Sequence, residues 1–458
     1  MTSSAPHPRP AGDQQRLWSV DEHLEDVLAA IRPLEPIELQ LLDAQGCVLV
    51  EDVTVPVALP PFDNSSMDGY AVRVADVQGA GEEFPAVLTV IGDVAAGSGG
   101  LPGGGAVGPG EAARIMTGAP LPQGAEAVVP VEWTDGGTGG GAAAGMTPAS
   151  EAPEGARGEV RVYRAAEARA HVRARGSDVQ AGDLALRAGT VLGPPQIALL
   201  AAIGRGTVRV RPRARVVVMS TGSELVQPSE PLTEGRIYDS NSFALAAAAR
   251  DAGAIAYRVG AVADDADTLR STIEDQLIRA DLIVTTGGVS VGAYDVVKEA
   301  LTPVASAASG ATDEEDVDTT RVDFRKLAMQ PGKPQGFGTV GPDATPLLAL
   351  PGNPVSSYVS FELFVRPAIR ALMGLPAADL HRPVVRAVLE ADKALRSPAG
   401  RRQFLRGKHD PERGTVSPVG GSGSHLIAAL AHADSLMVVP EDVTSVEPGS
   451  ELEVVLLG

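Results

Sequence analysis

The pattern of hydrophobic and polar positions divides the chain into three stretches of different character. Apolar residues recur at helical spacing over 19–31, where Ser19 followed by Glu22 forms a capping-box pattern that predicts a helix N-terminus. Short Val-rich segments then alternate with turns as far as residue 194, which is typical of β structure. A second helix is predicted over 195–203.

From residue 215 to 376, strand and helix patterns alternate. The predicted strands are 216–219, 254–262, 282–285, 322–329 and 347–350, and the predicted helices are 242–251, 267–279, 295–301 and 354–372. Such alternation is typical of a doubly wound α/β domain, a parallel sheet with helices on both faces. After residue 381, short strands predict a small C-terminal β-barrel, so the fold class is multidomain α/β and β.

Composition agrees with a soluble, multidomain protein. A length of 458 residues suggests three or so domains, and 44% hydrophobic residues allow sizeable cores. The single cysteine, Cys47, excludes an internal disulfide and a cysteine-based zinc cluster, and it fits the reducing cytoplasm. Residues 1–16 and the acidic segment 312–319 are expected to be disordered. Residues 1–15 have no apolar core, and no run of 18 apolar residues occurs elsewhere, so neither a signal peptide nor a membrane span is expected.

Charge narrows the choice of ligand. A net charge of −20 argues against a nucleic-acid partner, because phosphate contacts need a basic face. Of only five lysines, three lie close together in the sequence: Lys298, Lys326 and Lys333. They are either ordinary solvated lysines or compact ammonium groups placed for an oxyanion.

Three loops of the α/β region follow predicted strands and combine glycines with hydroxyl groups. They contain Ser220, Thr221, Gly222 and Glu224; Gly287, Gly288 and Ser290; and Gly352, Asn353 and Ser356. In an open parallel sheet the carboxyl ends of the strands share one edge, where ligands bind. Glycines allow close backbone approach to an anion, so three such loops together predict an anion site rather than three plain turns.

Two aspartates could extend this site. Asp239 precedes the predicted helix 242–251, where an N-cap is its ordinary role, although a carboxylate among anion-binding loops could also hold Mg²⁺. Asp295 is the second such candidate. Neither residue belongs to a specific metal signature.

The N-terminal half holds two polar segments between apolar strands, 61–70 and 115–120. Their aspartates could simply form turns, and physical reasoning from sequence leaves their role open. The Gly/Ala-rich segments 97–110 and 134–158 are expected to be flexible loops. No Walker, GxGxxG or HExxH motif occurs and the seven histidines are scattered, which argues against a histidine-based hydrolase or a zinc enzyme.

Seven motifs, in order, resemble those of the molybdopterin molybdenumtransferase family, to which the C-terminal region of gephyrin also belongs. They are PFDNSSMDGYAV (61–72), IMTGAPLPQGAEAVVPVE (115–132), MSTGSEL (219–225), IYDSN (237–241), TTGGVSVGAYD (285–295), KLAMQPGKP (326–334) and ALPGNPVSS (349–357). The resemblance extends over nearly the whole chain, from about residue 17 to 457.

The resemblance implies an elongated homodimer with sites shared between subunits. The expected parts are an extended N-terminal domain (17–60 and 160–194), an inserted β domain (61–159), a molybdopterin-binding α/β domain (195–376) and a C-terminal β domain (381–458). The implied reaction is Mg²⁺-dependent: adenylyl-molybdopterin and molybdate give molybdenum cofactor and AMP. Transient contacts with the molybdopterin adenylyltransferase and molybdopterin synthase are expected.

Site residues carry over by motif. Ser220, Ser290, Lys298, Lys333, Asn353 and Ser356 resemble contacts to the pterin phosphate or molybdate. Asp239 and Asp295 resemble ligands of Mg²⁺ or groups for AMP release, and Asp63, Asp68 and Thr117 resemble contributions from the N-terminal region. The other expected substrate-binding residues are Thr221, Gly222, Glu224, Asn241, Gly287, Gly288, Gly332 and Gly352.

The sequence departs from the family in places, and two rival functions remain. Some members carry Glu where this chain has Ser177, so no catalytic role is assigned there, and Glu126 stands where Asp is common. A molybdopterin adenylyltransferase would resemble the α/β domain alone, whereas this chain has further domains. A scaffold of the gephyrin type would be expected to carry a long linker or an appended domain.

Overall fold

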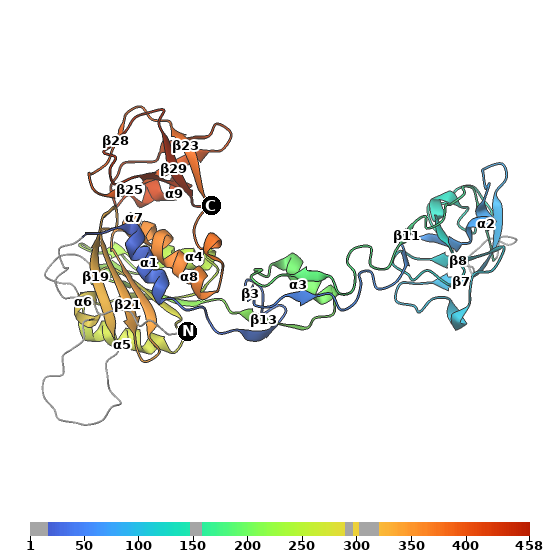
Figure 1. Cartoon of the computed structure of the whole chain (residues 1–458), viewed down its shortest axis with the longest axis horizontal. Helices are drawn as coiled ribbons and strands as arrows, with labels where there is room; N and C mark the ends of the chain where they lie inside the picture. Colours follow the sequence, from blue (N-terminus) through green and yellow to red (C-terminus); the bar gives the residue numbers. More distant parts are fainter. Residues whose placement is uncertain (1–16, 147–157, 289–295, 302–319) are drawn as a thin grey trace, which may run out of the picture.

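The computed structural model describes residues 17–146, 158–288, 296–301 and 320–458. The described chain is elongated (Figure 1): the α/β and C-terminal domains lie at one end, a small module lies in the middle, and the inserted β domain lies at the other end. The segments 1–16 and 312–319, which the sequence predicts to be disordered, fall outside the described residues. Within the described residues, every helix is too short or too polar to cross a membrane.

The α/β domain contains a seven-stranded sheet. Its strands, in spatial order, are β1 (Leu17–Trp18), β19 (Arg321–Leu327), β21 (Pro334–Val340), β22 (Thr345–Leu350), β18 (Leu282–Thr286), β14 (Arg215–Thr221) and β17 (Ile255–Val262). The last four strands are parallel to one another, as predicted. The sheet is mixed, however, because β21 is antiparallel to both of its neighbours. The sequence pattern did not predict β21.

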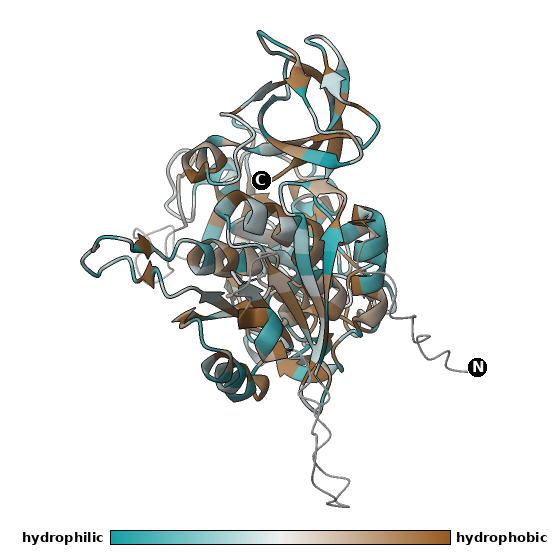
Figure 2. Cartoon of the chain, turned by 90° about the vertical axis from the view of Figure 1, so that its left-hand side faces the viewer, coloured by the Kyte–Doolittle hydropathy of each residue, from teal (hydrophilic) through white to brown (hydrophobic). Residues whose placement is uncertain are grey.

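Helices cover both faces of this sheet, which confirms the doubly wound α/β prediction. One face packs against α1 (Val20–Ala30), α4 (Asn241–Asp251) and a continuous helix formed by α7 (Pro354–Ser360), a π-helical segment (Phe361–Val365) and α8 (Arg366–Leu372). The other face packs against α5 (Ala266–Leu277) and α6 (Val296–Leu301). Figure 2 shows hydrophobic strands in the interior and hydrophilic stretches on the helices around them.

The predicted capping box begins α1. The Glu22 N–H donates to Ser19 Oγ at 3.0 Å, and the Ser19 N–H donates to Glu22 Oε2 at 2.9 Å. Because α1 buries Val20, His23 and Val27 against the sheet, the first described residues are part of the α/β core. Strand β1 adds to this attachment by pairing in parallel with β19.

The middle module is built from segments that are distant in sequence. Strand β13 (Thr207–Arg211) pairs antiparallel with β2 (Ile37–Gln40) and β3 (Val48–Leu49). Strands β4 (Val53–Thr54) and β12 (Leu184–Leu186) form a second pair, and α3 (Pro194–Ala202) packs on the same small core. This module separates the two ends of the molecule.

The inserted domain has a five-stranded sheet. Its order is β10 (Glu159–Val162), β7 (Ala86–Val94), β8 (Glu111–Ile115), β6 (Gly69–Val72) and β9 (Ala127–Pro130). The short pair β5 (Asn64–Ser65) and β11 (Val172–Arg173) joins it to the middle module.

The Gly-rich segment after β9 is more ordered than its composition predicts. The Asp135 carboxylate accepts hydrogen bonds from the N–H groups of Gly137, Gly139 and Arg161, at 2.9–3.0 Å, and Asp135 is only 2% exposed. Residues 134–140 are therefore held by hydrogen bonds, where the sequence predicts a flexible loop. The buried Asp135 carboxylate accepts the backbone N–H groups of this segment, and glycine has no side chain that could do so.

The C-terminal domain is a closed barrel, as predicted. It contains β23 (Val384–Leu389), β25 (Arg402–Asp410), β26 (Thr415–Pro418), β27 (Ser435–Val439) and β29 (Glu451–Leu456), and pairing of β25 with β27 closes it. Strand β20 (Met329–Gln330) of the α/β domain pairs in parallel with β25. The barrel is therefore hydrogen-bonded to the segment that leads into Lys333.

Candidate functional site

The predicted loops meet at one edge of the α/β sheet. Strands β14, β18 and β22 are parallel, so their carboxyl ends lie side by side at Thr221, Thr286 and Leu350. Strand β21 runs the opposite way and begins at Pro334, directly after Lys333. Its start therefore lies at the same edge, which brings the lysine turn to the three glycine loops.

Hydrogen bonds between side chains tie these loops together. Thr286 Oγ1 donates to the Pro351 carbonyl at 2.9 Å. The Asn241 amide donates to Thr286 Oγ1 at 3.1 Å and to the Gly352 carbonyl at 2.7 Å. The structure thus brings the predicted residues Asn241 and Gly352 together. Thr286 and Ser357, whose hydroxyl oxygens are 3.1 Å apart, were missed because both are buried.

Two glycines are required by close approach of the backbone. A Cβ at Gly287 would lie 2.3 Å from the Thr221 carbonyl oxygen, and one at Gly288 would lie 2.6 Å from Val297 Cγ2. Their φ angles of +102° and +61° lie in the region that favours glycine. The Thr221 hydroxyl, which faces these glycines, is buried and has no hydrogen-bond partner among the described residues. Such an unpaired buried group is costly unless a ligand or water satisfies it.

Asp239 is fully enclosed by protein donors. Its carboxylate accepts from Ser220 Oγ at 2.8 Å, from the Ser242 N–H at 3.1 Å and from the Ser242 hydroxyl, and Arg258 lies 3.7 Å away. Asp239 precedes Ser240, the N-cap of α4, and its carboxylate accepts the N–H of the second residue of the helix. Ser220 is likewise buried, and its hydroxyl is used by Asp239.

The Asp239 carboxylate does not fit a magnesium ion. The Asp239 side chain has no exposed surface, and Mg²⁺ needs carboxylate oxygens that can also face water and substrate. The described part of the chain contains no cluster of three or more His, Cys, Asp or Glu side chains suited to a metal. Asp295 and the substrate-binding candidate Ser290 lie outside the described residues.

The remaining residues of this edge differ in exposure. Lys298 is exposed on α6, and Lys333 is half-buried, although its turn suggests an exposed position. Asn353 is exposed and precedes α7 without making a side-chain cap, whereas Ser356 is buried in the first turn. The Glu224 carboxylate folds back over Gly222.

The three predicted residues of the N-terminal region form a separate group in the inserted domain. Asp68 Oδ1 accepts from the Thr117 N–H at 2.7 Å and from Thr117 Oγ1 at 2.9 Å. The Asp63 carboxylate pairs with Arg169 at 2.6 Å and accepts from the Arg175 N–H at 2.7 Å. The Arg169 guanidinium and the Arg175 N–H hold the pKa of Asp63 below its usual value.

The two groups are far apart in one chain. The strands beside Asp68 and Thr117 lie at one end of the molecule, and β21 lies at the other (Figure 1). Within one subunit the structure therefore does not bring Asp68 and Lys333 together.

Comparison with known proteins identifies the family. Residues 18–204 match the model "MoeA N-terminal region (domain I and II)", residues 217–371 match "Probable molybdopterin binding domain", and residues 388–457 match "MoeA C-terminal region (domain IV)". Molybdopterin molybdenumtransferase 2 of Mycobacterium tuberculosis is 45% identical over 436 residues, which cover 95% of this chain and 98% of the relative. The chain belongs to the molybdopterin molybdenumtransferase family.

Other relatives agree with that assignment. Molybdopterin molybdenumtransferase of Bacillus subtilis is 33% identical over 441 residues, covering 96% of this chain and 94% of the relative. The crystal structure of a molybdopterin biosynthesis MoeA protein from Pyrococcus horikosii has a TM-score of 0.69 and 31% identity, and it covers 97% of this chain and all of that one. As a member of this family, the chain is a transferase that inserts molybdenum into molybdopterin.

A loop of the C-terminal barrel also reaches the site of this family member. The Val355 N–H, in the first turn of α7, donates to the Ser424 carbonyl at 3.0 Å. The loop 420–425 is braced by Arg406, which is 3% exposed and donates to the Gly423 carbonyl at 3.3 Å and to the Gly421 carbonyl. This loop is not among those predicted from sequence, although its run of glycine and serine between two barrel strands resembles the three glycine loops of the α/β domain.

Proposed function

We propose that the chain transfers molybdate to adenylylated molybdopterin, with release of AMP, at the edge of the sheet where the glycine loops converge. The observation that carries this proposal is the meeting of three strand-end loops at one edge of the sheet, with the Lys333 turn beside the end of β22. Molybdate is a tetrahedral dianion and the pterin carries phosphate. Preorganised N–H groups, hydroxyls and ammonium groups stabilise such anions without reorganising during the reaction.

The direction of α7 supports an anion site. Helices 354–360, 361–365 and 366–372 follow one another without a break, and their N-terminal end faces the loops at Gly352 and Asn353. A helix N-terminus carries a partial positive charge, which favours an anion. At α7 this charge is the support, because Pro354 has no N–H and the Val355 N–H already donates to the Ser424 carbonyl. The 420–425 loop covers the first turn, so we include it in the proposed site.

Magnesium dependence is proposed from the family resemblance, and no step is assigned to the ion. In the described residues Asp239 acts on protein groups: it accepts from the Ser242 N–H in the first turn of α4 and orients Ser220. A requirement for Mg²⁺ would show as loss of AMP release after chelation and recovery when the ion is added back.

A homodimer with shared sites is part of the proposal. Asp63, Asp68 and Thr117 adjoin strands of the inserted domain, which lies at the opposite end of the chain from β21 and the adjoining Lys333. They can therefore serve the same reaction only if a second subunit supplies them. A two-fold dimer with isologous contacts would make two such sites. Transient contacts with the adenylyltransferase and with molybdopterin synthase, and a cytoplasmic location, belong to the same proposal.

The test is direct. The purified protein is incubated with adenylyl-molybdopterin, molybdate and Mg²⁺, and AMP and active cofactor are measured. We expect both products in equal amounts, each dependent on molybdate. Adenylylation of free molybdopterin from ATP by this chain alone would instead support the adenylyltransferase, and neither activity would support a scaffold.

A further inference from the structure

The turn that carries Lys333 rests on a buried glutamine. Gln335 is 1% exposed, and its side-chain amide donates to the Gly332 carbonyl at 2.7 Å and to Ser360 Oγ at 2.6 Å. Gly332 has a φ of +99°, and a Cβ at this position would lie 2.9 Å from Ser360 Oγ. The turn is therefore held against the last residue of α7, one helical turn after Ser356.

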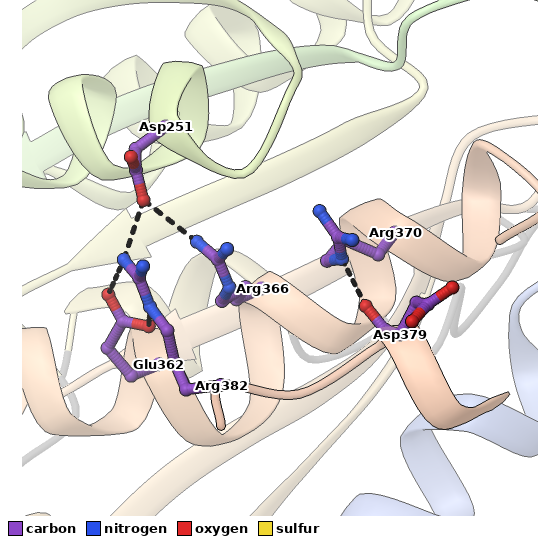
Figure 3. A network of polar contacts seen from close by, with 6 residues as sticks. All are labelled: Asp251, Glu362, Arg366, Arg370, Asp379 and Arg382. Carbon is purple, nitrogen blue, oxygen red and sulfur yellow. Dashed lines mark hydrogen bonds and ion pairs between the residues drawn. The ribbon is translucent and has the colours of Figure 1, made fainter. Parts of the chain in front are cut away.

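Ser360 leads directly into the π-helical segment, which is anchored from the opposite side. In this segment Glu362 is buried, and Arg382 contacts both of its carboxylate oxygens, at 2.9 and 3.2 Å. Figure 3 shows that Arg382 also reaches Asp251, which Arg366 contacts at 2.9 Å. π-Helical turns are uncommon and are frequent at functional sites. Here the segment connects this partly buried ion-pair network to the support of the Lys333 turn.

We propose that Gln335 and Ser360 are positioning residues that set the place of the Lys333 ammonium relative to the N-terminus of α7. The Glu362–Arg382 pair holds the π-helical segment from which this support extends. The inference rests on the proposed function, because it assumes that Lys333 acts on molybdate or the pterin phosphate.

The surroundings of Lys333 explain why such support matters. No carboxylate among the described residues pairs with Lys333, so no ion pair fixes its long side chain. A lysine side chain is long and flexible, so the place of its backbone limits where the ammonium can lie. An amide that fixes the Gly332 carbonyl holds the backbone beside Lys333 in place before the anion binds.

The experiment is a double-mutant cycle on the full-length enzyme. Gln335→Met keeps the approximate volume and removes both hydrogen bonds, and it is combined with Lys333→Ala. Gln196→Met is the matched control, because Gln196 also braces a glycine three residues away: its Oε1 accepts from the Gly193 N–H at 3.1 Å, in the middle module. Molybdate KM, kcat and melting temperature are measured for each variant.

We expect Gln335→Met to raise the molybdate KM about tenfold while kcat changes less than about twofold, and Gln196→Met to leave both unchanged. In the Lys333→Ala background, Gln335→Met should add less than about twofold, because the group that it positions is gone. Ser360→Ala should act in the same direction, and it serves if Gln335→Met fails to fold. Ser360→Thr, which keeps the hydroxyl, should restore part of the loss.

Two results would overturn the inference, and they have different meanings. If Gln335→Met and Ser360→Ala lower only the melting temperature, or raise KM equally in both backgrounds, the residues are structural and the proposed function stands. If Lys333→Ala itself leaves the molybdate KM and kcat unchanged, the proposed role of Lys333 fails and its positioning fails with it.

Discussion

The α/β edge and the inserted domain hold their polar groups in opposite ways. At the edge, Ser220, Asp239 and Thr286 are buried, and their hydrogen bonds join loops that follow different strands. In the inserted domain, Asp68 and Thr117 are exposed and bond mainly to each other. The edge resembles a preorganised binding site, whereas the exposed pair resembles a surface that is completed by something else.

The residues of the two regions are therefore expected to contribute differently to stability and activity. Buried groups at the α/β edge shape the loops, so changing them should affect both stability and activity. Exposed groups of the inserted domain support little of the fold, so changing them should affect activity alone. Stability measurements can therefore distinguish the two regions.

The largest effect is expected at Gly287. Gly287→Ala would place a Cβ 2.3 Å from the Thr221 carbonyl at a positive φ, so the loops must separate. We expect a loss of AMP release of at least about 100-fold and a loss of about 3 kcal/mol in the free energy of unfolding. Gly189→Ala is the control, because Gly189 has a similar φ of +87° with open space around it. Equal effects of the two variants would show that backbone strain, and not loop contact, accounts for the loss.

The next largest effects are expected from two isosteric changes, one at the α/β edge and one in the inserted domain, which should differ in their effect on stability. Asp239→Asn places an amide among the hydroxyl and N–H donors of Ser220 and Ser242, so we expect about 3 kcal/mol of destabilisation together with reduced activity. Asp68→Asn should change stability by less than about 0.5 kcal/mol while activity falls at least about tenfold. Urea unfolding and AMP release measure the two quantities. A destabilising Asp68→Asn would contradict the proposed contrast.

Acid should weaken the α/β end before the inserted domain. Burial, with a contribution from Arg325, lowers the pKa of His23 to about 3, so the folded state keeps this side chain neutral. As the pH falls below about 6.5, the unfolded chain gains a proton that the folded chain does not, and stability drops by up to about 1.4 kcal/mol per pH unit. The Asp63 pKa is also lowered, but its carboxylate stabilises the inserted domain at every pH above its ordinary pKa of 3.8, and this is lost only below that value.

Each region contains one of the two tryptophans, so this order can be measured. Trp18 stacks with Arg325 in the α/β domain, and Trp133 packs with His171 in the inserted domain. In Trp133→Phe, urea unfolding followed by Trp18 fluorescence should shift to lower urea between pH 7 and 5. In Trp18→Phe, the Trp133 signal should shift less. Adding His23→Phe should flatten the response of Trp18, and an unchanged slope would exclude His23 as its cause.

Local patterns were enough to predict much of the fold. The Ser19–Glu22 capping box and the alternation of strands and helices depend on neighbouring residues, and both are present in the structure. Strand β21 was missed because Pro334, Gly336 and Gly338 interrupt its pattern. These glycines are needed for packing against the neighbouring strand, because a Cβ at Gly338 would lie 1.8 Å from the Arg321 carbonyl oxygen.

Local sequence patterns predict only part of the site. Loops that follow parallel strands must share an edge, so the glycine loops could be placed together from sequence. The contact between Val355 and Ser424 joins two domains, and the support of Lys333 by Gln335 and Ser360 depends on how a helix lies on the sheet. No local pattern contains that information.

The central claim is that Asp68 of one subunit and Lys333 of another act in one site, and mixing two variants that each keep only low residual activity tests it most directly. Asp68→Ala and Lys333→Ala proteins are prepared separately, mixed in equal amounts after reversible dissociation, and assayed for AMP release. Random pairing makes about half of the dimers mixed, and each mixed dimer has one site with both residues intact, so roughly a quarter of wild-type activity should return. No recovery, with subunit exchange confirmed by differently tagged chains, would contradict the shared site.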